Sequence, residues 1–375
     1  MWKVLLLLAL APAAWAGTSH PILSLGSAAP NFELPGVDGK IHRLADYASS
    51  PVLVVVFTCN HCPIAQMYER RIMQLAADYR DRNVAVVAIQ PNDPKAITID
   101  ELDSSDMSDS LEEMKIRAEF KHLTYLYLYD GETQSVADAY GPQATPHVFV
   151  FDRDRRLRYE GRMDNSYRVE LVKTHEARDA IDALLAGREV AVKHTGVFGC
   201  STKWKEKQAA RLETLRKIES QPVQLEMASA EDLRKLRANP TKKTLLVSFW
   251  ATWCGSCMHE FPDLQDTFRM YGARDLELVT VAANMPDEKN SVLRLLEKMH
   301  ATSRNLLFAS ADTAALQAAF DPNWESAVPY TVLIAPDGRV LYQKQGAVDI
   351  LELRRTILAN LPSDYEGFNK YWSGQ

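Results

Sequence analysis

The chain has 375 residues, enough for two domains of ordinary size, and its 46% apolar and 25% charged residues exclude a disordered chain. The formal net charge of -6 argues against a nucleic-acid binder, which would need a basic face for the phosphates. Five cysteines are too few for a disulfide-stapled scaffold, and their odd number leaves at least one sulfur outside any intramolecular pairing.

Residues 1–16 have the features of a secretory signal peptide. Lys3 precedes a short apolar run, and Ala14-Trp15-Ala16 fits the small-x-small cleavage pattern. We expect cleavage after this tripeptide; an uncleaved N-terminal anchor is the alternative. No later apolar stretch is long enough for a transmembrane helix, so the sequence predicts a periplasmic or secreted chain without stable membrane insertion. Disulfide chemistry is possible in such a compartment.

The first half alternates strands and helices. Val52–Phe57 is a continuous apolar run typical of a buried central strand, and it leads into Cys59-Asn60-His61-Cys62-Pro63 and a segment of helical periodicity. Further strands are expected at 84–89, 125–129, 147–152 and 156–160, and helices at 111–122 and 133–140.

The second half repeats this order. Thr244–Trp250 reads as a strand, and Cys254-Gly255-Ser256-Cys257 and a helix follow it. Strands are expected at 276–282, 306–308, 330–335 and 340–344, and helices at 287–300, 313–320 and 351–360. Each half is therefore an α/β unit whose sheet is largely parallel near its centre. The expected division is a domain at 22–175, an extension and linker at 176–221, a domain at 222–362 and a tail at 363–375.

A Cys-x-x-Cys between a buried strand and a helix suits disulfide exchange. We expect the first sulfur to cap the helix, where free N–H groups and the dipole favour the attacking thiolate, and the second sulfur to resolve the mixed disulfide. A zinc site would need two further ligands at short spacing, but near Cys254 only His259 and Glu260 are available, on the same helix, and near Cys59 only His61 is. No metal is therefore expected, and no organic cofactor is expected because the cysteines carry the electrons.

The second motif resembles the active site of the thioredoxin superfamily. The run Trp250–Cys257, with Met258-His259-Glu260-Phe261-Pro262 after it, is similar to the TlpA-like branch, exported thiol–disulfide oxidoreductases of which some act in cytochrome c maturation. The resemblance implies that Val328-Pro329 is the cis-proline pair that holds the substrate. It also implies that Glu260 is a buried carboxylate that tunes the cysteines, although an exposed first-turn glutamate is an equal alternative. Trp250 and Trp253 are expected to pack around this site, and plain core aromatics are the alternative.

The first half resembles the peroxiredoxin-like or redoxin branch, of AhpC/TSA type. The matching runs are 29–34, 57–63, 127–130 and 145–147, and 198–204 is similar to that branch's C-terminal extension. Thr145-Pro146 would be its cis-proline pair, and His147 would then lie near the cysteines or be a plain strand residue. Together the two resemblances imply two tandem thioredoxin-like folds, each a central mixed sheet flanked by helices.

The first half does not carry the peroxidase pattern of the family it resembles. Peroxiredoxins have a Thr or Ser three residues before the reactive cysteine and a Pro four residues before that. Counting back from Cys62 gives Cys59 and Val55, and counting back from Cys59 gives Val56 and Val52. Disulfide exchange at Cys59 and Cys62 is therefore the preferred interpretation.

Three other features leave alternatives open. His61 either places positive charge near the Cys59 thiolate, which would make the Cys59/Cys62 pair more oxidising than Cys254/Cys257, or is a solvated loop residue. Cys200 is a buried inert thiol, a relay for the first pair, or a link to another chain. The segment 98–113 holds seven carboxylates and is expected to be a solvated loop.

The sequence thus predicts an exported oxidoreductase that exchanges disulfides through Cys59, Cys62, Cys254 and Cys257. Its partners would be protein thiols or disulfides and a redox protein that resets each site. A thiol peroxidase and a copper-binding carrier are the alternative functions. The sequence does not set the direction of electron flow.

Overall fold

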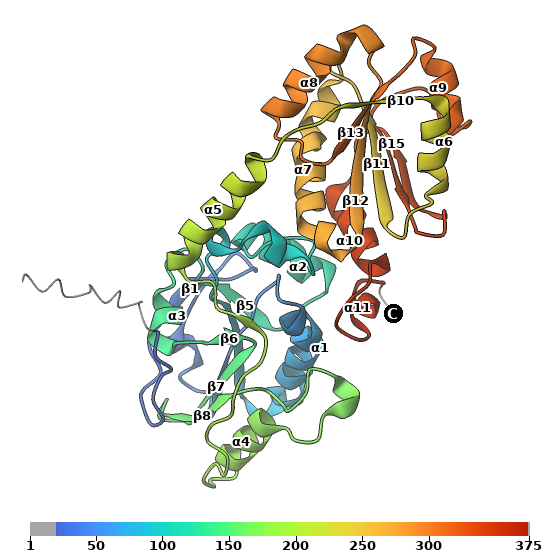
Figure 1. Cartoon of the computed structure of the whole chain (residues 1–375). Coiled ribbons are helices and arrows are strands. Elements are labelled where there is room, and N and C mark those ends of the chain that lie inside the picture. The colour runs from blue at the N-terminus through green and yellow to red at the C-terminus, as the bar shows by residue number, and fades with distance from the viewer. Residues whose placement is uncertain (1–19, 374–375) are drawn as a thin grey trace, which may run out of the picture.

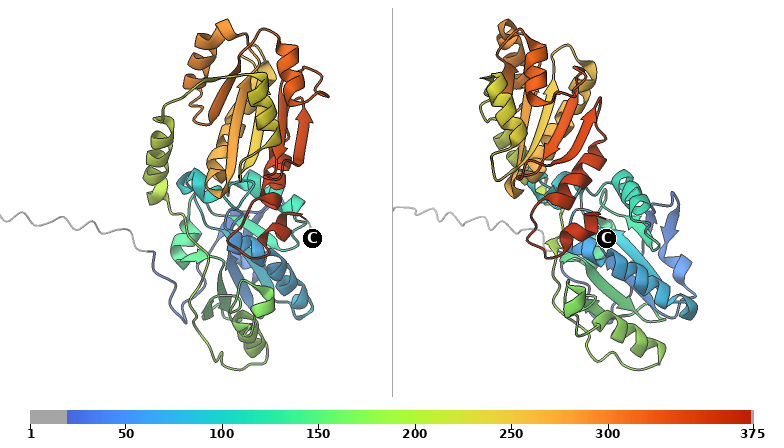
Figure 2. Two further views of the ribbon diagram at one scale, coloured as in Figure 1. Left: turned by 45° about the vertical axis from the view of Figure 1, so that its right-hand side comes forward. Right: turned by 90° about the vertical axis from the view of Figure 1, so that its right-hand side faces the viewer.

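The computed structural model describes residues 20–373, so the predicted signal peptide lies outside the described residues. Two α/β domains lie one above the other (Figures 1 and 2). Within the described range, no helix is both long and apolar enough to cross a membrane.

The first domain has a mixed sheet with strand order β5-β4-β3-β7-β8. β3 pairs in parallel with β4 and antiparallel with β7, and all five of its residues are buried because both faces of the sheet are covered. The bounds are β3 Leu53–Phe57, β4 Ala85–Gln90, β5 Leu126–Tyr129, β7 His147–Phe151 and β8 Leu157–Gly161.

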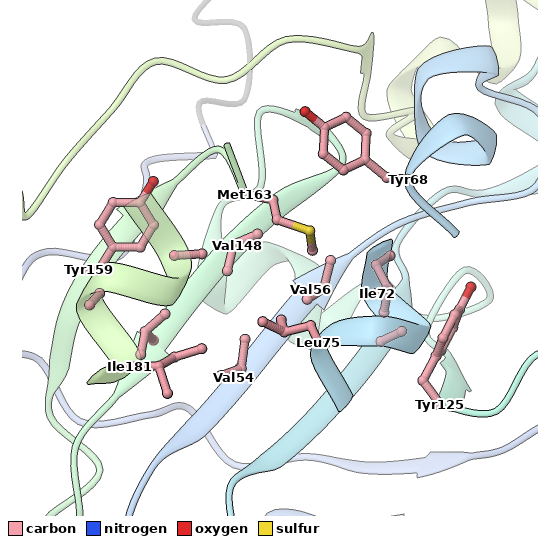
Figure 3. Packing of buried hydrophobic residues seen from close by; sticks show 14 of the residues in the cluster. Val54, Val56, Tyr68, Ile72, Leu75, Tyr125, Val148, Tyr159, Met163 and Ile181 are labelled. Carbon is pink, nitrogen blue, oxygen red and sulfur yellow. The ribbon is translucent and has the colours of Figure 1, made fainter. Parts of the chain in front are cut away.

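Helix α1 (Pro63–Asp78) follows the first cysteine motif and packs on the sheet. Its Ile72 and Leu75 belong to the same core as Val54 and Val56 of β3 (Figure 3). The other helices of this domain are α2 Leu111–Phe120, α3 Ser135–Tyr140 and α4 Glu176–Leu185.

Two short strand pairs accompany this sheet. β1 (Glu33–Pro35) and β2 (Ile41–Arg43) form a hairpin. β6 (Ala144–Thr145) pairs with β9 (Cys200–Ser201), which brings the extension back to the cysteine motif.

The second domain has a sheet with strand order β10-β13-β12-β11-β14-β15. Its central strand β11 is buried throughout, pairs in parallel with β12 and antiparallel with β14, and leads into helix α7. The strands are β10 Glu226–Ala228, β11 Thr244–Trp250, β12 Leu276–Ala282, β13 Arg304–Phe308, β14 Tyr330–Ile334 and β15 Val340–Gln345. The helices are α6 Ala230–Ala238, α7 Gly255–Tyr271, α8 Lys289–Lys298, α9 Thr313–Phe320 and α10 Ile350–Asn360. The expected α/β class with mixed sheets is confirmed in both domains.

Two helices connect the domains. The exposed helix α5 (Gln208–Glu219) runs along one side from the first domain to the second, and the C-terminal helix α11 (Phe368–Ser373) lies against α1 (Figures 1 and 2). Phe368 and Trp372 of α11 are buried with apolar residues of the second domain. The tail therefore packs on both domains.

The acidic segment 98–113 is not the solvated loop that its charges suggested. Ser105, Asp106 and Asp109 are fully buried. The carbonyl of Ser105 accepts a hydrogen bond from the Tyr271 hydroxyl at 2.6 Å, and Asp106 Oδ2 accepts one from Arg355 Nε at 2.7 Å. The segment is covered by the second domain, and charge pairing offsets the cost of burying its carboxylates.

Candidate functional site

In the second domain the cysteine motif begins α7 as expected. Cys254 is the N-cap residue, and the backbone N–H of Cys257 points at its Sγ at 3.2 Å. The two cysteines form a disulfide. Sγ of Cys254 also lies 3.6 Å from the carbonyl oxygen of Val328, and the Val328–Pro329 peptide bond is cis. The cysteine pair therefore lies beside the cis-proline segment that the resemblance implied.

In the first domain it is the second cysteine of the motif that caps the helix. Cys62 is the N-cap of α1, and Pro63 occupies the first helical position, where its missing N–H costs nothing. Sγ of Cys62 lies 3.3 Å from the carbonyl oxygen of Thr145, and the Thr145–Pro146 bond is cis. The expectation that Cys59 caps this helix is wrong, because the helix begins three residues later than the motif spacing suggested.

Strand pairing gives the same correspondence between the domains. Phe57 of β3 pairs with His147, and Phe249 of β11 pairs with Tyr330; each partner directly follows a cis-proline. Five residues beyond these two phenylalanines stand Cys62 and Cys254.

The same count places the remaining cysteines differently in the two domains. When Cys62 is aligned with Cys254, Cys59 of the first domain corresponds to Ala251 of the second, and Ala65 corresponds to Cys257. The two motifs are therefore offset by three residues in the fold, although their spacing in sequence is identical.

The environment of Cys62 stabilises its thiolate. Burial raises the pKa of Cys62, but hydrogen bonds from Cys200 and Cys59, the charge of His61 and the backbone N–H of Ala65 outweigh burial and hold the pKa well below its usual range. Burial and the contact with Cys62 raise the pKa of Cys59, whose Sγ lies 3.1 Å from Thr145 Oγ1.

His61 is buried and forms an ion pair with Asp109. His61 Nδ1 lies 2.6 Å from Asp109 Oδ2, and burial lowers the pKa of His61 less than Asp109 raises it. Asp109 Oδ1 accepts the backbone N–H groups of Asn60 and His61 at 2.9 and 3.0 Å, and Oδ2 accepts Asn92 Nδ2 at 2.8 Å. The alternative that His61 is a solvated loop residue is therefore wrong.

Asp109 was missed as a site residue. It lies 48 positions from His61 in the sequence, among six other acidic residues, and nothing in its spacing distinguishes it.

The same groups form the candidate metal-binding cluster of the described residues. One ligand atom each from Cys59, His61 and Asp109 lie within 4.8 Å of one another. Both oxygens of Asp109 already accept hydrogen bonds, so the cluster has the character of a hydrogen-bonded network around the cysteines.

Glu260 lies on α7, one turn beyond Cys257, and is buried. It is 6% exposed, and its Oε2 accepts the backbone N–H of Val348 at 3.0 Å, while Oε1 has no hydrogen-bond partner among residues 20–373. Burial raises the pKa of Glu260. The exposed alternative for this residue is wrong.

The two tryptophans near this motif differ. Trp250 packs with Cys254, Cys257 and Phe261 in one apolar cluster. Trp253 is 70% exposed, so the expectation that it packs around the site is wrong. It lies in the turn between β11 and α7, where its side chain offers an apolar surface beside Cys254.

His147 is buried in β7 and paired with Glu160. Its Nε2 lies 2.9 Å from Glu160 Oε2, and its Nδ1 accepts the backbone N–H of Gln143 at 3.2 Å. Both ring nitrogens are therefore occupied, and His147 is a structural residue of β7.

Cys200 contacts the first motif. It pairs with Thr145 across β6 and β9, and its backbone N–H donates to Cys62 Sγ at 3.2 Å. The hydrogen bond to Cys62 and then burial raise the pKa of Cys200. Three thiols thus meet at the cis-proline of the first domain.

Comparisons with known proteins agree with this division. The family model described as the AhpC/TSA family matches residues 25–160, and the one described as Redoxin matches residues 220–356. Each matched range contains one of the helix-capping cysteines. The finer expectation that the second half is TlpA-like is not distinguished by these models.

Curated relatives carry thiol–disulfide names. Thiol-disulfide oxidoreductase ResA of Geobacillus thermodenitrificans is 26% identical over 143 residues, which are 38% of this chain and 71% of that protein. Thiol:disulfide interchange protein CycY of Rhizobium leguminosarum is 26% identical over 123 residues, which are 31% of this chain and 57% of that protein.

A solved structure of a hypothetical protein from Sinorhizobium meliloti is 34% identical, covers 49% of this chain and 97% of its own, and has a TM-score of 0.43. The expectation of two tandem thioredoxin-like folds is confirmed by the two family models together. The chain therefore belongs to the thioredoxin superfamily, with an AhpC/TSA-family domain followed by a redoxin domain.

Proposed function

We propose that the chain is an exported thiol–disulfide oxidoreductase with one redox centre in each domain. One observation carries the proposal: Cys62 and Cys254 both cap a helix and both lie beside the carbonyl of the residue before a cis-proline. A cysteine at a helix N-terminus is favoured as a thiolate, which is the attacking species in disulfide exchange.

The second centre exchanges disulfides with protein substrates. In its reduced form, Cys254 attacks a substrate disulfide, and Cys257, one turn further into α7, attacks the resulting mixed disulfide and releases the substrate. The exposed side chain of Trp253 supplies an apolar contact for the bound polypeptide. Val328 and Pro329 form the neighbouring wall of the groove.

The first centre uses Cys62 as the thiolate and Cys59 as its partner in the disulfide. The ion pair of His61 and Asp109 sets the charge beside them. A thiolate that is stabilised in the reduced protein makes the corresponding disulfide more oxidising. The cysteines carry the electrons in both centres, so the exchange requires no organic cofactor.

Export places both centres where disulfides form and persist. The signal-like features of residues 1–16 support this localisation. A second redox protein is then needed to reset each centre after a turnover. N-terminal sequencing of the mature protein tests the cleavage after Ala16.

Thiol peroxidase activity is the second candidate, because the first domain matches the AhpC/TSA family. Cys62 stands where the reactive cysteine of that pattern would stand, but Cys59 stands where the pattern has Thr or Ser. A side chain that would hydrogen-bond the peroxide is thus replaced by a thiol. Consumption of hydrogen peroxide by the reduced chain distinguishes this candidate.

Insulin reduction and substrate trapping test the main proposal. The chain should catalyse reduction of insulin in the presence of a dithiol, and Cys254→Ser should abolish most of that activity. Cys257→Ser should accumulate mixed disulfides with protein partners, which mass spectrometry identifies. Absence of both insulin reduction and trapped partners would contradict the proposed function.

A further inference from the structure

Cys200 is the thiol of the first centre that reaches open space. Cys59 and Cys62 are 2% and 0% exposed, whereas Cys200 is partly exposed. Cys200 lines a cavity of about 500 Å³, and neither Cys59 nor Cys62 does. The cavity lies between the domains and is bounded also by residues 273–275 and by the tail at 362–365. A reagent in this cavity therefore meets Cys200 first.

Cys200 also contacts the reactive sulfur. The β6–β9 pairing holds Cys200 opposite Thr145, the residue whose carbonyl lies beside Cys62. The backbone N–H of Cys200 donates to Cys62 Sγ, and the Cys200 thiol is a further hydrogen-bond donor to the same sulfur. The fold thus places Cys62 between two thiols, Cys59 on the buried side and Cys200 on the cavity side.

A second group in the same wall indicates a ligand. His61 lines the cavity, and its Nε2 is buried and has no hydrogen-bond partner in the described chain. Its Nδ1 is occupied by Asp109, so Nε2 is the ring nitrogen left for another molecule. A buried polar atom without a partner is costly unless a ligand or water satisfies it.

We propose, building on the function proposed above, that Cys200 is a third redox-active cysteine, which pairs with Cys62 and is the sulfur at which small thiols and disulfides from the cavity react. The first centre then has two disulfide forms, Cys59–Cys62 and Cys62–Cys200. The second form is the one open to reagents.

The chemistry of the exchange balances without another reactant. A substrate thiolate attacks Cys200 Sγ of the Cys62–Cys200 disulfide, a bond forms between the substrate sulfur and Cys200, and Cys62 leaves with the electron pair as a thiolate. A second substrate thiolate attacks the substrate sulfur of this mixed disulfide, and Cys200 leaves and takes up a proton. Two substrate thiols become one disulfide, and the protein gains two electrons.

The low pKa of Cys62 suits its part in this exchange, because a thiol of low pKa leaves faster. Internal exchange connects the two forms. Cys59 attacks Cys62 and releases Cys200, which moves the disulfide inward with no net oxidation. The reverse attack by Cys200 on Cys62 returns it to the cavity side.

The cavity favours a small cationic thiol or disulfide. Its volume lies in the range of small-molecule sites. Five carboxylates line it, against Lys203 and Arg274. Lys203 is already paired with Glu101, and Arg274 donates to the backbone carbonyls of Asp103 and Pro362 at 2.6 and 3.0 Å. Even with His61 counted as cationic, the five carboxylates outnumber the cationic groups of the lining, so its net charge is negative and favours a cationic reagent.

The test uses the full chain with Cys254→Ser and Cys257→Ser, so that only the first centre titrates. The reduced protein is oxidised with cystamine, a dicationic disulfide, and digested with trypsin. Trypsin releases Cys62 in the peptide 44–70 and Cys200 in the peptide 194–203. With Cys59→Ser added, a disulfide crosslink between these two peptides should appear. In Cys200→Ser, oxidation to Cys59–Cys62 should slow by about tenfold or more, since the accessible sulfur is gone.

Two further measurements complete the design. Cys200→Ser/Ser201→Cys keeps a thiol at the next residue, which faces the other side of β9, and should not restore the rate. Cystamine should oxidise the parent protein about tenfold faster than the anionic glutathione disulfide at low ionic strength. Cys200→Ala serves as a second variant if the serine variant does not fold.

The possible results separate the two proposals. If Cys200→Ser is oxidised to Cys59–Cys62 at the parental rate and no crosslink to the peptide 194–203 forms, the role of Cys200 is overturned while the first centre stands. If the parent forms neither disulfide, the redox function of the first domain itself is overturned, and the role of Cys200 with it. Equal rates with the two reagents would overturn the preference for a cationic substrate.

Discussion

Cys62 and Cys254 are counterparts in the two domains, although one is the second cysteine of its motif and the other is the first. Each caps its helix, and each Sγ lies within 3.6 Å of the carbonyl before a cis-proline. The other cysteine of each pair therefore lies on a different side of the reactive cysteine along the chain in the two domains. In the second domain it follows within the helix, as Cys257, and in the first domain it precedes the helix, as Cys59.

This relationship predicts which cysteine of the first centre carries the negative charge. In the chain with Cys254→Ser and Cys257→Ser, the ultraviolet absorbance of a thiolate should appear at pH values below the ordinary range of a cysteine, because the pKa of Cys62 is lowered. Cys62→Ser should remove this absorbance. Cys59→Ser should keep it, because the serine hydroxyl can still donate a hydrogen bond to the Cys62 sulfur.

The opposite pattern would reassign the reactive sulfur. If the absorbance at low pH disappeared in Cys59→Ser and survived in Cys62→Ser, Cys59 would be the thiolate. Urea unfolding of both variants provides the control that each is folded during the titration.

The two centres should differ in reduction potential. We expect Cys59/Cys62 to be more oxidising than Cys254/Cys257, because His61 and the hydrogen bonds at Cys62 favour the reduced form. His61→Asn keeps a hydrogen-bond donor for Asp109 but removes the charge. It should lower the potential of the first centre by about 30 mV for each unit by which the Cys62 pKa rises.

Redox titration with one centre at a time replaced by serine measures both potentials. His42→Asn is the matched control, because His42 also pairs with an aspartate, Asp38, at 3.0 Å but on the exposed hairpin. It should leave both potentials unchanged. Equal potentials, or a higher value for Cys254/Cys257, would contradict the expected role of His61.

Much of the fold could be predicted because its central strands are continuous apolar runs and its turns carry clear signals. β3, β11 and the helix after β11 are where the sequence places them, whereas the helix after β3 begins three residues beyond the start expected from a cap at Cys59. Strand β10 and helix α6 were not predicted, because the short amphipathic helix has few apolar residues and the strand is short. The cysteines themselves were identifiable from spacing alone.

The equivalence of Cys62 and Cys254 could not be predicted from spacing. It depends on which strand residue pairs with the residue after each cis-proline, and on the helix start that Pro63 imposes. The burial of Asp106 and Asp109 could not be predicted from the sequence either. A run of acidic residues is usually solvated, and only the covering second domain makes this one an interface.

The interface should depend on Asp106. Its carboxylate is fully buried and accepts hydrogen bonds from Arg117 Nη2 at 2.5 Å and from Arg355 Nε at 2.7 Å. Asp106→Asn removes the charge between two guanidinium groups, one of them wholly buried. We expect the free energy of unfolding to fall by about 3–5 kcal/mol, the usual cost of breaking a buried ion pair. Urea denaturation of the full chain measures the change.

Glu231→Gln is the control for Asp106. Glu231 pairs with Lys235 at 2.7 Å on the exposed face of α6, and a pair of this kind contributes little to stability. Its loss should leave the unfolding curve unchanged. If Asp106→Asn were equally silent, the two arginines would have to find other partners, and Asp106 would not hold the domains together.

Glu260 should destabilise the second domain when it is ionised. Burial raises its pKa in the folded chain, so the folded state binds its proton more tightly than the unfolded state does. The loss of folding stability caused by the ionised Glu260 is complete above the pKa of Glu260 in the folded chain. It disappears below the pKa of Glu260 in the unfolded chain. Glu260→Gln keeps an acceptor for the Val348 N–H without the charge. It should therefore raise Tm at neutral pH by a few degrees, and the gain should vanish in acid.

Thermal unfolding at neutral and acid pH checks this prediction, and Glu297→Gln on the exposed face of α8 is the control that should change neither curve. Glu260→Gln also tests whether Glu260 acts on the cysteines. A proton acceptor one turn from Cys257 should affect how the rate of disulfide exchange at Cys257 depends on pH. A lower Tm for Glu260→Gln at neutral pH would mean that the carboxylate stabilises the fold. An unchanged pH profile would restrict Glu260 to a structural role at Val348.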